Sequence, residues 1–65
     1  MTLIVNGESR TVAVATLAEA LQALDYADAT VATALNGEFV PARKREDVAL
    51  KDGDRIEILA PRQGG

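Results

Sequence analysis

The residues most able to take part in a reaction are the last two of the chain, Gly64 and Gly65. Neither carries a Cβ atom, so a backbone made of them can enter a narrow channel that any side chain would block. The group presented at such an end is an α-carboxylate, ionised at neutral pH because its reference pKa is about 3.3–3.7. In a partner's active site this carboxylate can attack the α-phosphorus of ATP, forming an acyl-adenylate and releasing pyrophosphate. The activated carbonyl can then accept sulfur, or another nucleophile, with loss of AMP.

The composition argues against most other chemistries. The 65 residues include no His, no Cys and no Trp, which removes most metal sites, Ser-His-Asp and Cys-His catalysis, and disulfides. Ten acidic residues against seven basic ones give a net charge of -3, which argues against a nucleic-acid partner. A single small domain also has no room in its core for a ligand pocket of several hundred Å³. We therefore expect no catalytic residues and no metal site, and chemistry shared with a larger partner.

The same sequence predicts neither a membrane span nor a secretory signal. No apolar run approaches the ~20 residues that cross a bilayer, and Met1–Asn6 lacks a basic region followed by a long apolar stretch. We expect a cytoplasmic protein with no membrane partner. From the residues alone, the alternative remains that Gly64-Gly65 is merely a frayed terminus.

Two Asn-Gly pairs predict two β-hairpins, because both central residues of a type I′ turn need positive φ. The pairs are Asn6-Gly7 and Asn36-Gly37. The strands that they join are expected at Thr2–Val5, Ser9–Val14, Val31–Leu35 and Glu38–Val40. Pro41 ends the last of these, since it cannot donate a ladder hydrogen bond.

A helix is predicted between the hairpins. Thr16 and Glu19 form the T-x-x-E capping box at its start. Leu17, Leu21 and Leu24 then repeat as one apolar stripe. The helix should stop near Asp25-Tyr26, before turn-prone Asp28, and at about nine residues it must pack on a sheet to persist.

The final strand is predicted at Arg55–Leu59, after a tight turn over Lys51–Asp54 in which Gly53 supplies the positive φ. Ile56 and Ile58 should face the core and Leu59 the opposite side. Residues 42–49 are interpreted as an irregular connection with room for one helical turn. Residues 61–65 are expected to be a flexible tail after a domain of residues 1–60.

This element order predicts an α+β fold with a mixed sheet of four to five strands and one helix packed on one face. For a continuous sheet the last strand must be central and parallel to the first, which is the ubiquitin-like β-grasp arrangement. Ile4 and Leu59 would then share the open face and could form an apolar partner surface. The alternative is two scattered surface aliphatics. Arg62, in the tail, could contact an acidic partner or stay exposed to solvent.

Taken together, several segments resemble the ThiS branch of the ThiS/MoaD sulfur-carrier family over essentially the whole chain. The segments are Asn6-Gly7, Thr16–Leu21, Ala34–Glu38 leading to Val40-Pro41, Leu50 with Asp52–Ile58, and Gly64-Gly65. The loop after Pro41 departs from the family, because it has Arg43-Lys44-Arg45-Glu46 where many relatives have an aromatic residue. We expect this basic triplet to form a solvated turn, with an acidic partner as the alternative.

The resemblance implies a sulfur carrier for the thiazole ring of thiamine, acting as a co-substrate rather than an enzyme. An E1-like adenylyltransferase of the ThiF type would adenylate Gly65, with Gly64 as its threading partner. A cysteine desulfurase would supply sulfur to form a thiocarboxylate, which thiazole synthase (ThiG) would accept. No cofactor would be bound stably, and ATP would be used by the activating partner.

Three other functions remain open at this point. They are the small subunit of molybdopterin synthase, a ubiquitin-like modifier in which Gly65 joins a lysine, and a non-catalytic β-grasp interaction module.

Overall fold

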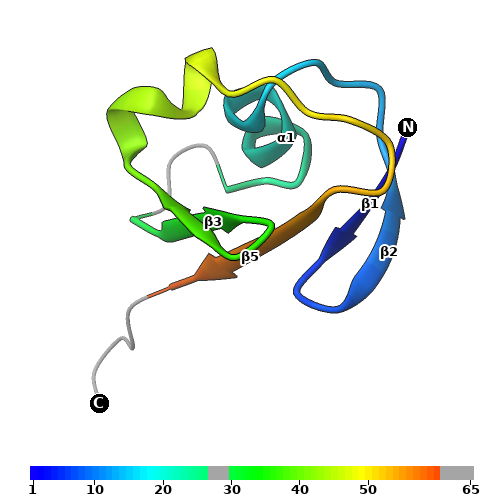
Figure 1. The fold of residues 1–65 in the computed structure, drawn as a ribbon, viewed down its shortest axis with the longest axis horizontal. Coiled ribbons are helices and arrows are strands. Elements are labelled where there is room, and N and C mark those ends of the chain that lie inside the picture. Colours follow the sequence, from blue (N-terminus) through cyan, green and yellow to red (C-terminus); the bar gives the residue numbers. More distant parts are fainter. Residues whose placement is uncertain (27–29, 61–65) are drawn as a thin grey trace.

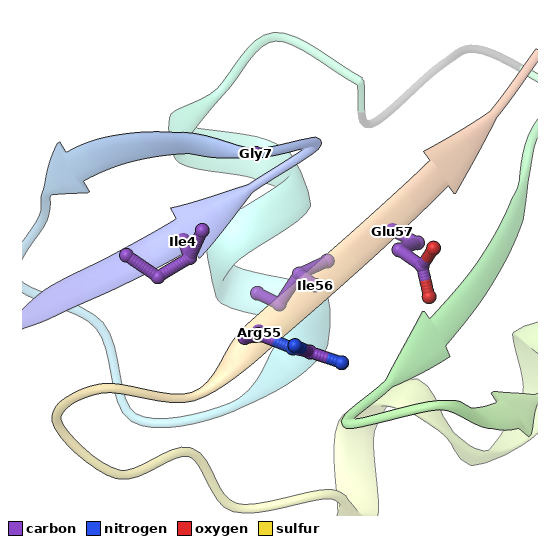
Figure 2. A pocket seen from close by; sticks show the side chains of 5 residues that line it. All are labelled: Ile4, Gly7, Arg55, Ile56 and Glu57. Atoms are coloured by element: carbon purple, nitrogen blue, oxygen red, sulfur yellow. The ribbon is translucent and has the colours of Figure 1, made fainter.

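Five strands form one mixed sheet in the computed structural model, which describes residues 1–26 and 30–60 (Figure 1). Their order in space is β2-β1-β5-β3-β4. The strands are β1 (Thr2–Val5), β2 (Glu8–Thr11), β3 (Ala32–Leu35), β4 (Glu38–Val40) and β5 (Arg55–Leu59). The last strand is central, parallel to β1 and antiparallel to β3. Figure 2 shows Ile4 of β1 beside Arg55 and Ile56 of β5, and Ile4 pairs with Arg55. The predicted α+β sheet and its central last strand are confirmed.

The second strand differs most from the prediction, and the third begins at Ala32 instead of Val31. The second strand was expected to run to Val14, whereas β2 ends at Thr11, whose partner is Thr2 at the start of β1. The Val12 N–H still donates to the Met1 carbonyl, and beyond it β1 offers no further partner. Val12 and Val14 instead pack, half-buried, against the core. These two β-forming residues therefore lie in the connection between β2 and the helix, not in the sheet.

The helix α1 (Leu17–Ala23) lies across one face of the sheet (Figure 1). The Thr16 hydroxyl accepts a hydrogen bond from the Glu19 N–H at 3.2 Å, as the capping box predicts. The Glu19 carboxylate accepts from the Ala15 N–H at 2.7 Å, one residue before the cap. The helix ends at its C-cap, Leu24, and Asp25 follows with a φ of 70°, a left-handed conformation that turns the chain away.

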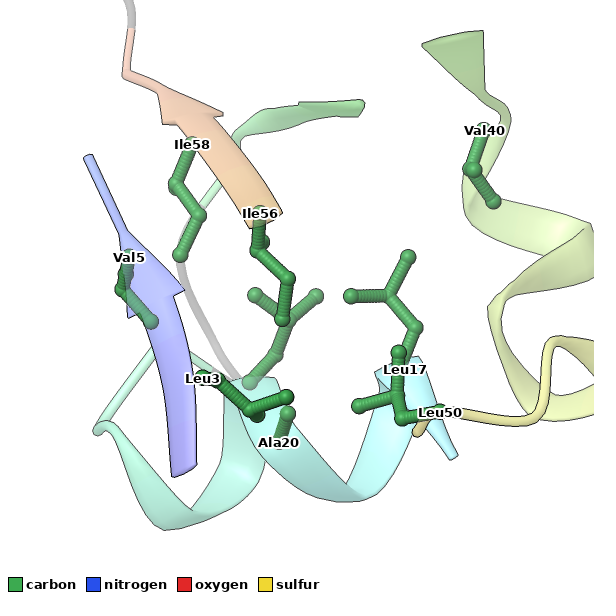
Figure 3. Close-up of a cluster of buried hydrophobic side chains, with 9 residues drawn as sticks. Leu3, Val5, Leu17, Ala20, Val40, Leu50, Ile56 and Ile58 are labelled. Atoms are coloured by element: carbon green, nitrogen blue, oxygen red, sulfur yellow. The ribbon is translucent and has the colours of Figure 1, made fainter. Parts of the chain in front are cut away.

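An aliphatic core fills the space between α1 and the sheet (Figure 3). Leu17 and Ala20 of the helix are fully buried, and Leu3 and Ile56 meet them from β1 and β5. The core comprises Leu3, Val5, Leu17, Ala20, Leu21, Val40, Leu50, Ile56 and Ile58. Alternate residues of β1 and β5 therefore face inward, as their sequence pattern predicts.

A 3-10 helix, η1 (Ala42–Asp47), occupies most of the predicted irregular connection. Arg45 anchors it: its Nη2 donates to the Val31 carbonyl at 2.6 Å, and its Nε donates to the Thr33 hydroxyl at 3.1 Å. The buried Thr33 hydroxyl in turn donates to the Val40 carbonyl at 2.9 Å. The basic triplet is thus divided, because Arg43 and Lys44 are exposed while Arg45 ties η1 to β3.

Candidate functional site

The end of β5 is where the predicted reactive segment joins the fold. Leu59 is the last residue of the strand, and Ala60 is the last residue that the structure describes. Arg62, Gly64 and Gly65, together with the predicted tail over 61–65, lie outside the described residues. The surface surrounding Leu59 is therefore the described part of the candidate site.

An apolar patch surrounds Leu59 on the open face of the sheet. We define the apolar patch as Ala32, Ala34, Phe39 and Leu59. The sheet register places Leu59 opposite Ala32, and Phe39 opposite Ala34. Leu59 is 75% exposed and Phe39 is 69% exposed, so two large apolar side chains face solvent here. The four residues, with Thr33 and Glu57, line a surface groove of ≈ 260 Å³. An exposed apolar surface of this kind is typical of a partner-binding site.

The structure does not bring Ile4 and Leu59 together, although both lie on the open face. Ile4 pairs with Arg55, and Leu59 lies four residues further along β5, or about 13 Å at the rise of an extended strand. Figure 2 shows Ile4 at a different groove, of ≈ 320 Å³, which Gly7, Arg55, Ile56 and Glu57 also line. Whether either residue contacts a partner stays a prediction.

Sequence reasoning missed Phe39, the large apolar neighbour of Leu59 in the patch. The signal was present in the second hairpin. With Val40 facing the core, the period of two turns Phe39 outward. A two-residue turn at Asn36-Gly37 then sets Phe39 opposite Ala34.

The Asn6 side chain holds the end of β5 from the β1 side. The Ile4 and Asn6 N–H groups donate to the Asp54 and Ile56 carbonyls, each at 2.9 Å. Beyond Asn6 the ladder is continued by its side chain, whose Oδ1 accepts from the Ile58 N–H at 2.8 Å and whose Nδ2 donates to the Ile58 carbonyl at 3.1 Å. This carboxamide therefore replaces a peptide group in the β1–β5 ladder.

The asparagine of the other hairpin holds the start of β5. The Asn36 Oδ1 accepts from the Arg55 N–H at 2.9 Å, and its Nδ2 donates to the Asp54 carboxylate at 3.1 Å. The buried Asp54 also accepts from the Lys51 N–H at 2.8 Å. These hydrogen bonds, that from Lys51 first, lower the pKa of Asp54 below its ordinary value of 3.8. Both ends of the central strand are thus bound by turn asparagines.

The part of the chain that the structure describes, residues 1–26 and 30–60, contains neither a metal centre nor a membrane-spanning helix. Within these ranges, no group of His, Cys, Asp or Glu side chains is arranged to hold a metal ion. Nor does any helix in the described part of the chain have the length and apolar character to span a membrane.

The whole chain is similar in sequence and structure to known proteins. A sequence model of the ThiS family matches residues 3–65. The crystal structure of the thiamine biosynthesis protein ThiS from Geobacter metallireducens is 39% identical, with a TM-score of 0.82 and 100% of both chains covered. The solution structure of a thiamine biosynthesis protein from that organism is 38% identical, with a TM-score of 0.80, covering 100% of this chain and 88% of the other.

A longer relative contains a segment of the same kind. A thiazole synthase of Paramagnetospirillum magneticum is 39% identical over 66 residues, which cover 100% of this chain and 20% of the relative. This chain therefore spans about one fifth of that protein's length.

Proposed function

Because this chain belongs to the ThiS family, we propose that it is a sulfur carrier of thiamine biosynthesis and not an enzyme, with Gly65 as the residue that carries the sulfur. The observation that carries the proposal is the family match, which extends from Leu3 through Gly64 and Gly65. The ThiS structure that aligns over the full length of both chains supports it. The absence of His and Cys from the sequence supports a carrier whose chemistry is performed by partners.

The proposed reaction at Gly65 has three balanced steps. A carboxylate oxygen attacks the α-phosphorus of ATP, so that an acyl-AMP anhydride forms and pyrophosphate leaves. The terminal sulfur of an enzyme persulfide attacks the activated carbonyl carbon and displaces AMP. A thiol then reduces the sulfur–sulfur bond, releasing the thiocarboxylate together with a disulfide. Two electrons from the thiol balance the last step, and the carrier itself needs no bound cofactor.

Three partners follow from this sequence of steps. A ThiF-type adenylyltransferase supplies the ATP site, and a cysteine desulfurase supplies the persulfide. A ThiG-type thiazole synthase accepts the sulfur from the thiocarboxylate. The thiazole synthase that contains a segment similar to this chain supports the third partner.

The short reach of the chain end supports a role for the apolar patch in docking. Residues 61–65 number five, and five residues span at most about 18 Å even when fully extended. An active site that receives Gly65 must therefore lie within that distance of Ala60, so the surface around it must approach the patch. We assign Leu59 and Phe39 to the docking surface, with Arg62 as an adjoining contact. Ile4, four strand positions from Leu59, lies at its far margin.

Adenylation of tail variants tests the proposal. The protein is mixed with a ThiF-type enzyme and ATP, and released pyrophosphate is measured. Wild type should release pyrophosphate, whereas deletion of Gly65 should abolish the release because the reacting carboxylate is displaced by one residue. Gly64→Val should reduce it strongly, since a branched side chain blocks a narrow channel. Gln63→Ala, a tail change outside the glycine pair, is the matched control and should retain activity.

Two results would reject the proposal. The first is no pyrophosphate release from wild type with an enzyme that activates its own carrier. The second is full release after deletion of Gly65. The sulfur acceptor is tested separately by gene loss: a requirement for thiamine supports thiazole synthesis, whereas a requirement for molybdenum cofactor would assign the chain to molybdopterin synthase.

A further inference from the structure

We infer that Asn6 is a positioning residue for the reaction at Gly65, because its side-chain carboxamide fixes the end of the strand from which the reactive residues continue. The inference rests on the proposed function and deepens it. It concerns a residue remote in sequence from the chain end: 52 positions separate Asn6 from Ile58, to which it is bonded.

The local geometry explains why a side chain is needed at this point. After Val5 the chain turns into β2 through Asn6 and Gly7, with φ values of 51° and 83°. The backbone of β1 therefore provides no group opposite Ile58. The Asn6 carboxamide supplies both a donor and an acceptor there, at 3.1 Å and 2.8 Å. On its other side the end of β5 is held by β3, where Leu59 pairs with Ala32. Asn6 thus completes a two-sided support for the end of the strand.

The position of this support connects it to delivery of Gly65. Ile58 precedes Gly65 by seven residues, so the place and direction in which β5 ends fix where the segment that leads to Gly65 begins. The Asn6 contacts end at Ile58, whereas three residues of the apolar patch lie on β3 and β4 and Leu59 pairs with Ala32 of β3, so docking through the patch should largely persist without them. The docked protein would then present Gly65 in the productive orientation for a smaller fraction of the time. A positioning defect therefore lowers kcat, whereas a docking defect raises KM.

The chain provides variants that separate this role from general stability. Asn6→Gly retains a residue that accepts positive φ and removes the carboxamide. Asn6→Asp is nearly isosteric, but its carboxylate cannot donate to the Ile58 carbonyl and faces that oxygen with like charge. The matched control is Asn36→Gly, because Asn36 also occupies an Asn-Gly turn, with φ 50°, and also binds β5. Its contacts lie at the start of the strand, at Asp54 and Arg55.

Steady-state adenylation with a ThiF-type enzyme tests the inference, at a temperature where circular dichroism shows every variant folded. We expect Asn6→Asp, which loses one hydrogen bond to Ile58, to lower kcat about threefold to tenfold with KM nearly unchanged. Asn6→Gly, which loses both hydrogen bonds, should lower kcat at least as much. Asn36→Gly should leave kcat within about twofold of wild type. Hydrogen exchange at the Ile58 N–H should accelerate in the Asn6 variants and not in Asn36→Gly.

The outcomes distinguish this inference from the proposed function. Normal wild-type adenylation together with an unchanged kcat in Asn6→Gly would overturn the positioning role alone. Equal losses of kcat in Asn6→Gly and Asn36→Gly would also overturn it, because the effect would then follow stability. Unchanged exchange at Ile58 would contradict the structural premise. Failure of wild type itself to be adenylated would instead reject the proposed function.

Discussion

Substitution of Leu59 by lysine separates partner binding from folding at the apolar patch. Leu59 is 75% exposed, so the folded protein alone gains little from its apolar side chain. Glu57 lies two residues earlier on the same face of β5, and its charge is opposite to that of the new ammonium group. An exposed substitution of this kind should change the free energy of unfolding by no more than about 0.5 kcal/mol.

The expected effect on binding follows from the same exposed fraction. Complete burial of a leucine side chain contributes about 1.5–3 kcal/mol. A partner that covers the 75% of Leu59 now exposed would therefore gain about 1–2 kcal/mol from it. Losing this contribution weakens binding about fivefold to thirtyfold in Kd, and desolvation of the ammonium group adds to the loss.

Titration of a ThiF-type or ThiG-type partner measures Kd, and urea denaturation measures unfolding. Thr11→Lys is the matched control, because Thr11 is exposed on the same sheet face but lies on β2, away from the patch. Leu59→Lys should bind at least fivefold more weakly than wild type, and Thr11→Lys should bind within about twofold of it. Equal binding by Leu59→Lys and wild type to both partners would remove the patch from the docking surface.

Two predictions concern the fold that supports the site. The lowered pKa of Asp54 contributes stability that is fully present above its unfolded value of 3.8 and is lost as pH falls through the folded value. Asp54→Ala should therefore lower the free energy of unfolding by about 1–3 kcal/mol at pH 7, as measured with denaturant. This difference from wild type should narrow at pH 3, and a difference independent of pH would contradict this reasoning. Leu17→Ala, at a fully buried core position, should lower the unfolding free energy by about 2–5 kcal/mol, whereas Leu59→Ala should cost less than about 1 kcal/mol; similar losses in both would show that the burial pattern is wrong.

The parts of the fold that could be predicted from the sequence are those encoded by neighbouring residues. Asn6-Gly7 and Asn36-Gly37 each require positive φ at two positions, and both form the expected tight turns. Thr16 caps the helix through the Glu19 N–H as its spacing indicates. Once these elements are known, a continuous sheet requires Arg55–Leu59 at its centre, which the structure confirms.

The parts that could not be predicted depend on contacts between distant segments. Ile4 and Leu59 were interpreted as a possible shared patch because both face outward, with scattered surface aliphatics as the alternative. The register of parallel strands has no local signal, and Ile4 lies beside Arg55. The connection after Pro41 was interpreted as irregular with room for one helical turn; it contains the six-residue helix η1, which Arg45 ties to the Val31 carbonyl 14 residues away. The Asn6 carboxamide was interpreted only as part of a turn, since its bonds to Ile58 appear only after the sheet is assembled.

The mass of the sulfur-loaded protein tests the central claim most directly. The full chain is incubated with a ThiF-type enzyme, ATP, a cysteine desulfurase, cysteine and a thiol reductant, and its intact mass and C-terminal fragments are measured. We predict the replacement of one oxygen by one sulfur, located at Gly65, and no replacement when ATP is omitted. An unchanged mass with partners that load their own carrier, or sulfur located at any other residue, would contradict the account.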